Sequence, residues 1–290
     1  MKIQVIIAKK AGACAGVKRA LKLAYDCAKT PGYASTLEPL IHNPNVVAEL
    51  QEKGVALANS IKDVNTQAVI IRSHGVSPRV FEELKSFGLK IIDATCPNVS
   101  RAQKEAKSLG QTYGEVLIVG EDEHPEVIGI AEWAKLAGAK VYVCKCGDDV
   151  PDRLGQHEIG VVVQTTQNKK NLDSVLHALE KINCKFHLSN TICHATSERQ
   201  EAARQLSSQV DVMIVLGGRN SANTARLFEI CQENCKNVFL IQNLEELDSI
   251  DFSTFLPKDN DILKIGITAG ASTPVSQIEA CYEKLISFSI

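Results

Sequence analysis

Short runs rich in valine and isoleucine alternate along this chain with segments in which apolar residues recur every three or four positions. The runs are typical of strands in parallel sheets that are covered on both faces, and the segments are typical of amphipathic helices. The pattern predicts strands at 3–8, 36–41, 55–58, 68–73, 90–95, 115–120, 140–144, 159–164, 185–192, 211–218, 237–242 and 264–270. It predicts helices at 16–28, 45–54, 77–88, 98–110, 125–138, 168–182, 195–206, 223–235 and 273–285.

The same order of elements occurs three times, and polar residues stand at the same junctions of each copy. One cysteine per copy follows a strand, and a polar residue follows it 28 positions later, which gives the pairs Cys14 and His42, Cys96 and His124, and Cys193 and Ser221. A fixed spacing of this kind indicates internal repeats. Ligands of open parallel sheets bind beyond the carboxyl ends of the strands, where these junctions fall. The sequence therefore predicts an α/β fold of three pseudo-threefold related lobes, with parallel sheets around a central site.

The composition excludes some classes of protein but does not by itself indicate a function. The chain has 290 residues, 44% of them hydrophobic, and a net charge of -2. This charge lacks the basic excess that is typical of nucleic-acid-binding proteins. No apolar run approaches the roughly 18 residues of a membrane span. The first residues of the chain resemble a lipoprotein signal only faintly, because Lys9 and Lys10 interrupt the apolar stretch that such a signal needs. We interpret these residues as the first strand of a cytoplasmic protein. The ten cysteines indicate reduced thiols, some of them metal ligands.

Three thiolates that meet at one point suit two kinds of metal centre. Zinc takes a fourth ligand or a water beside three cysteines. A [4Fe–4S] cluster held by three cysteines leaves one iron open, and that iron can act as a Lewis acid while the cluster passes electrons. The other junction residues, rich in hydrogen-bond donors, suit an anion such as phosphate; they are His42, His74, His124, Thr165, Thr166, Ser221, Asn223 and Ser272. Glu126 is the carboxylate placed to act as a general acid beside them.

Other cysteines, histidines and glycines have simpler interpretations. Cys27, Cys184 and Cys281 resemble small core residues. The pairs Cys144/Cys146 and Cys231/Cys235 have the spacing for metal binding but lack the second half of a zinc site. His157, His177 and His187 have no counterpart in the other repeats, so we interpret them as surface or packing residues. The segment around Gly217 lacks the dinucleotide-binding spacing, and no G-x-S-x-G nucleophile elbow occurs.

Nine motifs in this order resemble the 4-hydroxy-3-methylbut-2-enyl diphosphate reductase family along the whole chain. The motifs are GACAGVKRA, PLIHNPNVV, SHGVSP, DATCPNVS, HPEVIGI, QTTQ, NTICHATSERQ, GGRNSANT and TAGAS. The resemblance implies a [4Fe–4S] cluster on Cys14, Cys96 and Cys193 and a substrate diphosphate held by His42, His74, His124, Ser221, Asn223 and Ser272. It also implies that Glu126 delivers protons, that Thr165 orients the substrate hydroxyl, and that His124 belongs to the catalytic set.

The implied reaction is the reductive removal of the allylic hydroxyl of 4-hydroxy-3-methylbut-2-enyl diphosphate, which yields isopentenyl and dimethylallyl diphosphate. It is the last step of the non-mevalonate isoprenoid pathway. The implied electron donor is a ferredoxin or a flavodoxin, and no nucleic acid or membrane is expected as a partner. The lobes are expected at 15–96, 97–193 and 194–290, with the strand in 1–14 completing the sheet of the third lobe.

Two positions depart from the family pattern, and two rival functions stay open. Ala13 replaces the phenylalanine usual before the first cysteine, and Ala222 stands where many members carry a second serine. The closer rival is a three-lobed cluster lyase resembling quinolinate synthase, which needs no external reductant; the motifs HPEV and NSANT disfavour it. The second rival is a non-catalytic iron-sulfur or zinc-binding module.

Overall fold

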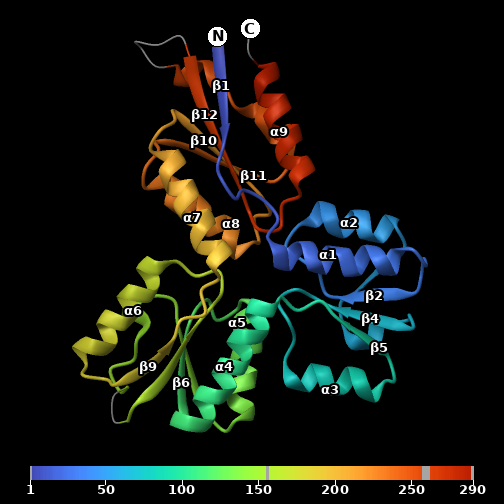
Figure 1. The fold of residues 1–290 in the computed structure, drawn as a ribbon, viewed down its shortest axis with the longest axis vertical. Helices are drawn as coiled ribbons and strands as arrows, with labels where there is room; N and C mark the ends of the chain where they lie inside the picture. Colours follow the sequence, from blue (N-terminus) through green and yellow to red (C-terminus); the bar gives the residue numbers. More distant parts are fainter. Residues whose placement is uncertain (1, 155–156, 257–261, 289–290) are drawn as a thin grey trace. The chain divides into compact units, whose positions relative to one another are not determined.

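The computed structural model describes residues 2–154, 157–256 and 262–288 of the chain, which form two compact units. We call Met1–Ala15, His42–Pro44 and His194–Ile290 the one-sheet unit, and Gly16–Ile41 with Asn45–Cys193 the two-sheet unit. All three sheets have four parallel strands, as the valine- and isoleucine-rich runs predicted. Figure 1 shows the helices on the faces of these sheets.

The first sheet of the two-sheet unit has the strand order β3-β2-β4-β5. Its strands are β2 (Ala34–Leu37), β3 (Ala56–Ala58), β4 (Ala68–Ile71) and β5 (Lys90–Asp93). The associated helices are α1 (Ala15–Ala28), α2 (Pro44–Glu52) and α3 (Pro78–Ser86), with a 3-10 turn at Ile61–Asp63. Figure 1 shows α3 on one face of the sheet and α1 and α2 on the other.

The strand predicted at 36–41 lies two residues earlier and is shorter than expected, at Ala34–Leu37. Glu38 takes a left-handed backbone conformation, with φ 58°, and directs the chain out of the sheet. Pro39 follows, and a proline has no N–H to donate to a strand ladder. The segment around Leu40 and His42 is therefore a loop beyond the carboxyl end of β2.

The second sheet of the two-sheet unit has the order β7-β6-β8-β9. Its strands are β6 (Glu115–Val119), β7 (Lys140–Cys144), β8 (Ile159–Val163) and β9 (Phe186–Ser189). The helices are α4 (Pro97–Tyr113), α5 (Pro125–Leu136) and α6 (Lys169–Lys181), with a 3-10 turn at Gly147–Asp149. Successive side chains of β6 point to opposite faces, so Val116 and Ile118 pack under α4 and α5 while Leu117 and Val119 pack under α6.

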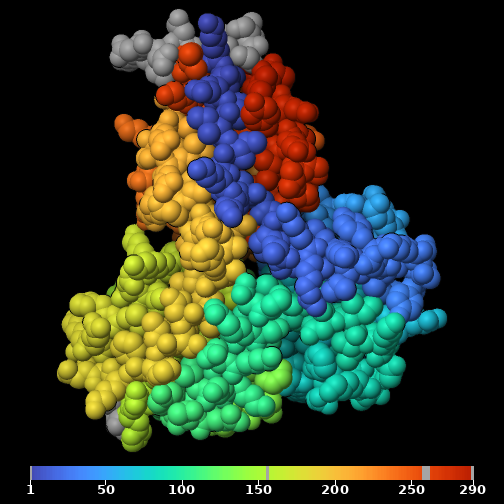
Figure 2. All heavy atoms as spheres, in the orientation of Figure 1, coloured from blue at the N-terminus to red at the C-terminus, as the bar shows by residue number. Residues whose placement is uncertain are grey.

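The sheet of the one-sheet unit has the order β1-β12-β10-β11. Its strands are β1 (Lys2–Ile7), β10 (Val212–Leu216), β11 (Asn237–Ile241) and β12 (Ile262–Ala269). The helices are α7 (His194–Ser207), α8 (Ala222–Gln232) and α9 (Val275–Ser287), with 3-10 turns at Leu244–Ser249 and Phe252–Phe255. Ile214 and Leu216 of β10 pack with α9, and Met213 and Val215 pack with α7 and α8. Figure 2 shows β1 at the surface beside α9, which it contacts.

Within the described residues, no helix is long and apolar enough to cross a membrane.

Candidate functional site

The polar junction residues follow strands along the chain, three of them after the strands of each sheet. Cys14, Ser221 and Ser272 come after β1, β10 and β12, while His42, His74 and Cys96 come after β2, β4 and β5. His124, Thr165 and Cys193 come after β6, β8 and β9. The carboxyl ends of parallel strands lie at one edge of a sheet, which is where open α/β sheets bind ligands.

In the two-sheet unit, Cys96 and Cys193 are linked through a neighbouring asparagine. Cys96 is the residue before α4, and Asn98, the second residue of that helix, donates a hydrogen bond from Nδ2 to Cys193 Sγ over 3.0 Å. The backbone N–H of Cys193 donates to the Thr165 carbonyl at 2.9 Å, and that of Cys96 donates to the Ser73 carbonyl at 2.9 Å. Backbone hydrogen bonds thus hold both cysteines next to the ends of strands, and both side chains are partly exposed.

His124 begins α5 and also faces a second histidine. Its Nδ1 accepts a hydrogen bond from the backbone N–H of Glu126 at 3.1 Å, which caps the helix. A ring nitrogen that accepts is unprotonated, so the proton of the neutral ring is assigned to Nε2. The rings of His74 and His124 meet edge to face with their centroids 5.7 Å apart. The pair is placed to offer donors to an anion.

Glu126 is the central acid of this unit and is only 1% exposed. Its two carboxylate oxygens accept hydrogen bonds from Thr165, one from the backbone N–H at 2.6 Å and one from the hydroxyl at 2.9 Å. Burial raises the pKa of Glu126 from 4.5 to about 7, although the two bonds from Thr165 oppose the rise. A carboxyl group with a pKa near neutrality is suited to proton donation at physiological pH.

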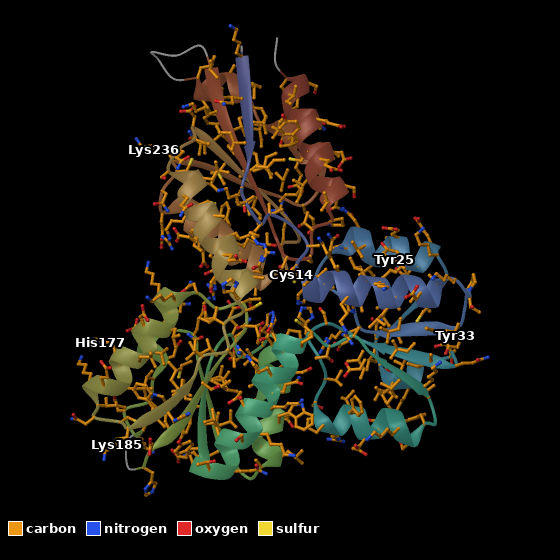
Figure 3. The ribbon with its side chains drawn as sticks, viewed as in Figure 1. Cys14, Tyr25, Tyr33, His177, Lys185 and Lys236 are labelled. Carbon is orange, nitrogen blue, oxygen red and sulfur yellow. The ribbon has the colours of Figure 1, made fainter. Side chains whose placement is uncertain are left out.

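In the one-sheet unit, Cys14 lies where the chain leaves β1 and enters α1 (Figure 3). Its backbone N–H donates to the Ala271 carbonyl at 3.3 Å. Arg199, which is 3% exposed on α7, donates from its guanidinium to the carbonyl of Gly12 at 2.8 Å. Gly12 itself has a φ of 88°, which an alanine would adopt only under strain. Arg199 and Gly12 therefore shape the loop that presents Cys14.

His42 packs against the loop that carries Ser272. The hydroxyl of Ser272 donates to the His42 carbonyl at 3.1 Å, and Nδ2 of Asn43 donates to the Ser272 carbonyl at 2.9 Å. A side chain at Gly218 would meet the same His42 carbonyl at 2.6 Å, so this glycine permits the close approach. Burial lowers the pKa of His42, which keeps its ring neutral near pH 7.

Ser221 and Asn223 stand at the start of α8, where exposed N–H groups favour an anion. Ser221 Oγ accepts a hydrogen bond from the backbone N–H of Thr224 at 3.3 Å and so caps the helix. Asn223 is 3% exposed, and neither its side-chain oxygen nor its nitrogen bonds to any described residue. Leaving a buried polar group unbonded costs roughly 1–3 kcal/mol. A bound anion would accept a hydrogen bond from the side-chain nitrogen of Asn223.

The predicted site residues thus fall into two groups, one in each unit. The two-sheet unit holds Cys96, Cys193, His74, His124, Glu126 and Thr165, and the one-sheet unit holds Cys14, His42, Ser221, Asn223 and Ser272. In the described ranges, no group of three or more His, Cys, Asp and Glu side chains has the geometry of a metal site.

The remaining cysteines and histidines behave as packing or surface residues. Cys27, Cys144, Cys184, Cys231, Cys235 and Cys281 are buried. Burial raises the pKa of the Cys144, Cys231 and Cys281 thiols to about 12, which disfavours the thiolate form that binds metals. His157 and His177 are exposed, and His187 stacks on Tyr113 with ring centroids 5.8 Å apart. Figure 3 shows His177 on the surface.

Four residues that position the candidate site were not predicted from the sequence. They are Asn98, which bonds to Cys193; Arg199, which holds the Cys14 loop; Asn43, which holds the Ser272 loop; and Thr191, whose hydroxyl bonds to the Val163 carbonyl at the end of β8. Asn98, Arg199 and Asn43 all lie within the quoted motifs. The sequence carries no signal for the role of Arg199, because the Gly12 carbonyl that it contacts is 187 positions away.

The model of the LytB protein family matches residues 5–286. The 4-hydroxy-3-methylbut-2-enyl diphosphate reductase of Geotalea uraniireducens (strain Rf4) is 43% identical over 283 residues, which are 98% of this chain and 97% of that protein. The enzyme of the same name from Syntrophotalea carbinolica is 40% identical over 290 residues, covering 99% of this chain and 100% of that protein.

Two solved structures are similar over nearly the whole chain. One is a structure of (E)-4-hydroxy-3-methyl-but-2-enyl diphosphate reductase, with 39% identity, a TM-score of 0.69 and coverage of 98% of this chain and 100% of that one. The other is the E-1-hydroxy-2-methyl-but-2-enyl-4-diphosphate reductase from Plasmodium falciparum, with 26% identity, a TM-score of 0.84 and coverage of 98% and 88%. With the family model matched from residue 5 to residue 286, this chain belongs to the LytB family.

Proposed function

We propose that this chain is a 4-hydroxy-3-methylbut-2-enyl diphosphate reductase, an iron-sulfur oxidoreductase that removes the allylic hydroxyl of its substrate. The products are isopentenyl and dimethylallyl diphosphate, at the last step of the non-mevalonate isoprenoid pathway. The observation that carries the proposal is the buried Glu126 carboxyl, held by Thr165 and with its pKa raised to about 7, in the unit that also contains Cys96 and Cys193.

The donor set fits an iron-sulfur cluster. Cys14, Cys96 and Cys193 are partly exposed, in contrast to the buried cysteines, and each stands directly before a helix. Thiolates are favoured at helix N-termini and are the ligands that iron-sulfur clusters use. Three of them would hold a [4Fe–4S] cluster, one per chain, with one iron left without a protein ligand. Such a cluster supplies electrons one at a time and a Lewis-acid site for the substrate hydroxyl.

The residues of the chain divide the remaining tasks. His42, His74, His124, Ser221, Asn223 and Ser272 bind the diphosphate, with Asn223 contributing the buried amide that has no partner among the described residues. Thr165 orients the substrate hydroxyl through the same side chain that bonds to Glu126. Glu126 donates the proton with which that hydroxyl leaves as water.

The overall change is balanced by two electrons and two protons. The carbon–oxygen bond breaks, one proton leaves with the hydroxyl as water, and the second proton goes to carbon at either end of the allyl group. Protonation at the two ends gives the two products. We propose a ferredoxin or flavodoxin as the electron donor and the cytoplasm as the place of reaction. We also propose lobe boundaries at 15–96, 97–193 and 194–290, with strand 1–14 belonging to the third lobe.

One experiment tests the function directly. The protein is purified without oxygen, analysed for iron and acid-labile sulfide, and supplied with 4-hydroxy-3-methylbut-2-enyl diphosphate and a chemical reductant. We expect iron and sulfide near four atoms each per chain, as a [4Fe–4S] cluster requires, and both isoprenoid products only when the reductant is present. Zinc without sulfide would contradict the proposal, and a cluster without reductant-dependent turnover would favour a lyase.

Replacing Asn223 with alanine is expected to weaken inhibition by inorganic diphosphate about 10- to 150-fold. The change removes a hydrogen bond to a charged group, worth roughly 1.5–3 kcal/mol. Asn234→Ala is the control, because Asn234 lies beyond the other end of α8 and its side-chain amide donates to the Ile230 carbonyl there. Inhibition constants from steady-state kinetics measure the effect. Equal inhibition of Asn223→Ala and the wild type would remove Asn223 from the anion site.

A further inference from the structure

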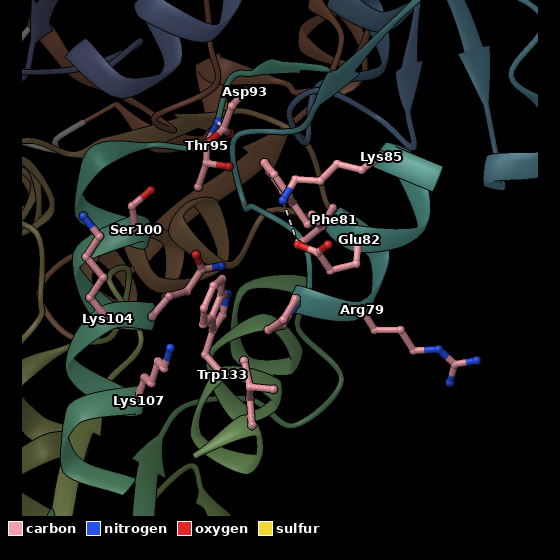
Figure 4. A pocket seen from close by; sticks show the side chains of 14 residues that line it. Arg79, Phe81, Glu82, Lys85, Asp93, Thr95, Ser100, Lys104, Lys107 and Trp133 are labelled. Carbon is pink, nitrogen blue, oxygen red and sulfur yellow. Dashed lines mark hydrogen bonds and ion pairs between the residues drawn. The ribbon is translucent and has the colours of Figure 1, made fainter. Parts of the chain in front are cut away.

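A cavity of about 800 Å³ lies in the two-sheet unit among α3, α4 and α5 (Figure 4). Its lining contains none of the residues assigned above to the cluster or the diphosphate. Val76, Phe81 and Trp133 of α5 are apolar residues of its lining, and Figure 4 shows the side chains of Phe81 and Trp133. Cavities of roughly 300–1,000 Å³ with mainly apolar walls and a few polar groups are typical of small-molecule sites.

Two buried donors lack a partner in this cavity. Neither Nε2 of Gln103 nor Nε1 of Trp133 makes a hydrogen bond to any residue that the structure describes. Gln103 is 7% exposed, and each such group left unbonded costs roughly 1–3 kcal/mol. A ligand that carries acceptor atoms beside an apolar body would satisfy both donors.

The charge around the cavity is predominantly positive. Arg79, Lys85, Lys104 and Lys107 line it, against the acidic side chains Glu82 and Asp93. Lys85 is paired with Glu82 at 2.7 Å, and Asp93 accepts a hydrogen bond from its own loop, at the Thr95 backbone N–H. Lys107 lies 5.7 Å from the centre of the Trp133 ring. Lys104 and Lys107 are therefore placed to meet an anionic group beside the tryptophan.

We propose that this cavity binds an anion with an apolar body, such as a hydrocarbon phosphate ester. The apolar part packs against Phe81 and Trp133, and the anionic part accepts hydrogen bonds from Gln103, Trp133 and the lysines. Tight binding requires both parts of such a ligand. The apolar wall contacts only the hydrocarbon part, and the clustered donors and positive charges contact only the anionic part. The site is separate from the proposed catalytic residues, so it stands whether or not the proposed function is correct.

Trp133 is the one tryptophan of the chain, so intrinsic fluorescence reports directly on this cavity. Geranyl diphosphate is the probe, titrated in the presence of excess inorganic diphosphate, which occupies the proposed catalytic anion site. We expect a saturable change in fluorescence. Geraniol, which lacks the anion, and inorganic diphosphate alone should need at least about 10-fold higher concentration, as expected when one charge-assisted contact is lost.

The matched variants remove equal charge from two faces of the same unit. Lys104→Ala/Lys107→Ala should weaken geranyl diphosphate binding at least about 10-fold. Lys181→Ala/Lys185→Ala, which removes two exposed lysines outside this cavity, should leave binding unchanged. Equal effects of the two pairs, a non-saturable signal, or equal binding of geraniol or of inorganic diphosphate would overturn the proposal.

The hydrogen bond between Asn98 and Cys193 supports a second inference, which rests on the proposed function. The Asn98 amide donates a hydrogen bond to Cys193 Sγ over 3.0 Å. Hydrogen bonds to cluster-ligating sulfurs are among the factors that set cluster reduction potentials. We infer that Asn98 is a positioning residue that raises the midpoint potential of the cluster, because a donor beside the thiolate stabilises the more negative, reduced state.

Asn98→Leu removes the donor while keeping a side chain of similar size, and Asn98→Asp replaces the amide with an anion. Both variants should retain iron and sulfide but have lower midpoint potentials, measured by redox titration followed by EPR. A tenfold loss of reduced-state stability corresponds to about 59 mV for one electron. An unchanged potential in cluster-loaded variants would overturn this inference, whereas a wild-type protein without a cluster would instead contradict the proposed function.

Discussion

Replacing Glu126 with glutamine is expected to lower turnover by about 10²- to 10⁴-fold while the protein still folds and binds its metal and substrate. Glutamine keeps the size of the side chain and one acceptor for Thr165, but it cannot donate a proton as a carboxylic acid does. General acid catalysis typically contributes a factor of this size. Iron content, substrate affinity and single-turnover rates measured together separate loss of proton transfer from loss of binding.

The pH dependence gives an independent check on the same residue. With the pKa of Glu126 raised to about 7, the carboxyl is protonated below that pH and ionised above it. Wild-type turnover should therefore fall roughly tenfold per unit as pH rises above about 7, since the acid must carry its proton. Asp122→Asn is the control, because Asp122 lies in the turn just before α5 and is exposed. Near-normal turnover of Glu126→Gln would leave Glu126 as a helix-start residue without a catalytic role.

The free energy of unfolding should depend on pH through the raised pKa of Glu126, and this can be measured without any substrate. Below about pH 4.5 Glu126 is protonated in both the folded and the unfolded chain, but between about 4.5 and 7 only the unfolded chain releases the proton. Ionisation therefore stabilises the unfolded state relative to the folded state as pH rises. The contribution of Glu126 to the free energy of unfolding falls by about 3 kcal/mol across this window. Glu126→Gln should lack this fall when urea unfolding is compared at pH 5 and pH 7.5.

Replacing any one of Cys14, Cys96 and Cys193 with serine is expected to remove or degrade the cluster and abolish activity. The serine hydroxyl is a hard oxygen ligand and substitutes poorly for a thiolate on iron. The three variants should behave alike although Cys14 belongs to one unit and the other two cysteines to the other. Iron, sulfide and the EPR spectrum of the reduced protein, recorded after anaerobic purification, measure the outcome.

Cysteines outside this set provide the controls. Cys146→Ser changes a partly exposed thiol, and Cys281→Ala changes a buried thiol whose pKa burial raises to about 12. Both variants should retain iron content and turnover near those of the wild type. Comparable losses of iron across the two groups would mean that the ligand set has been assigned to the wrong residues.

Local patterns in the sequence determined the order of elements, the three repeated units and the class of fold. A strand or helix shows its period in a few consecutive residues, so the alternation of β6 or the amphipathic face of α6 could be recognised without the rest of the chain. The nine motifs then indicated the family, and the match from residue 5 to residue 286 confirmed it. The misplaced strand before His42 shows the limit, because the backbone turn at Glu38 has no periodic signature.

The tertiary structure decided the chemical environment of the candidate residues. Glu126 is an ordinary glutamate at a helix start until the loop after β8, 39 positions later, folds over it, excludes water and supplies two hydrogen bonds from Thr165. Burial then raises its pKa to about 7, because a charged carboxylate is costly away from water. The contact of Asn98 with Cys193 spans 95 positions and that of Arg199 with Gly12 spans 187. A residue's identity states which bonds it can form, but only the folded chain decides its partner and its exposure to water.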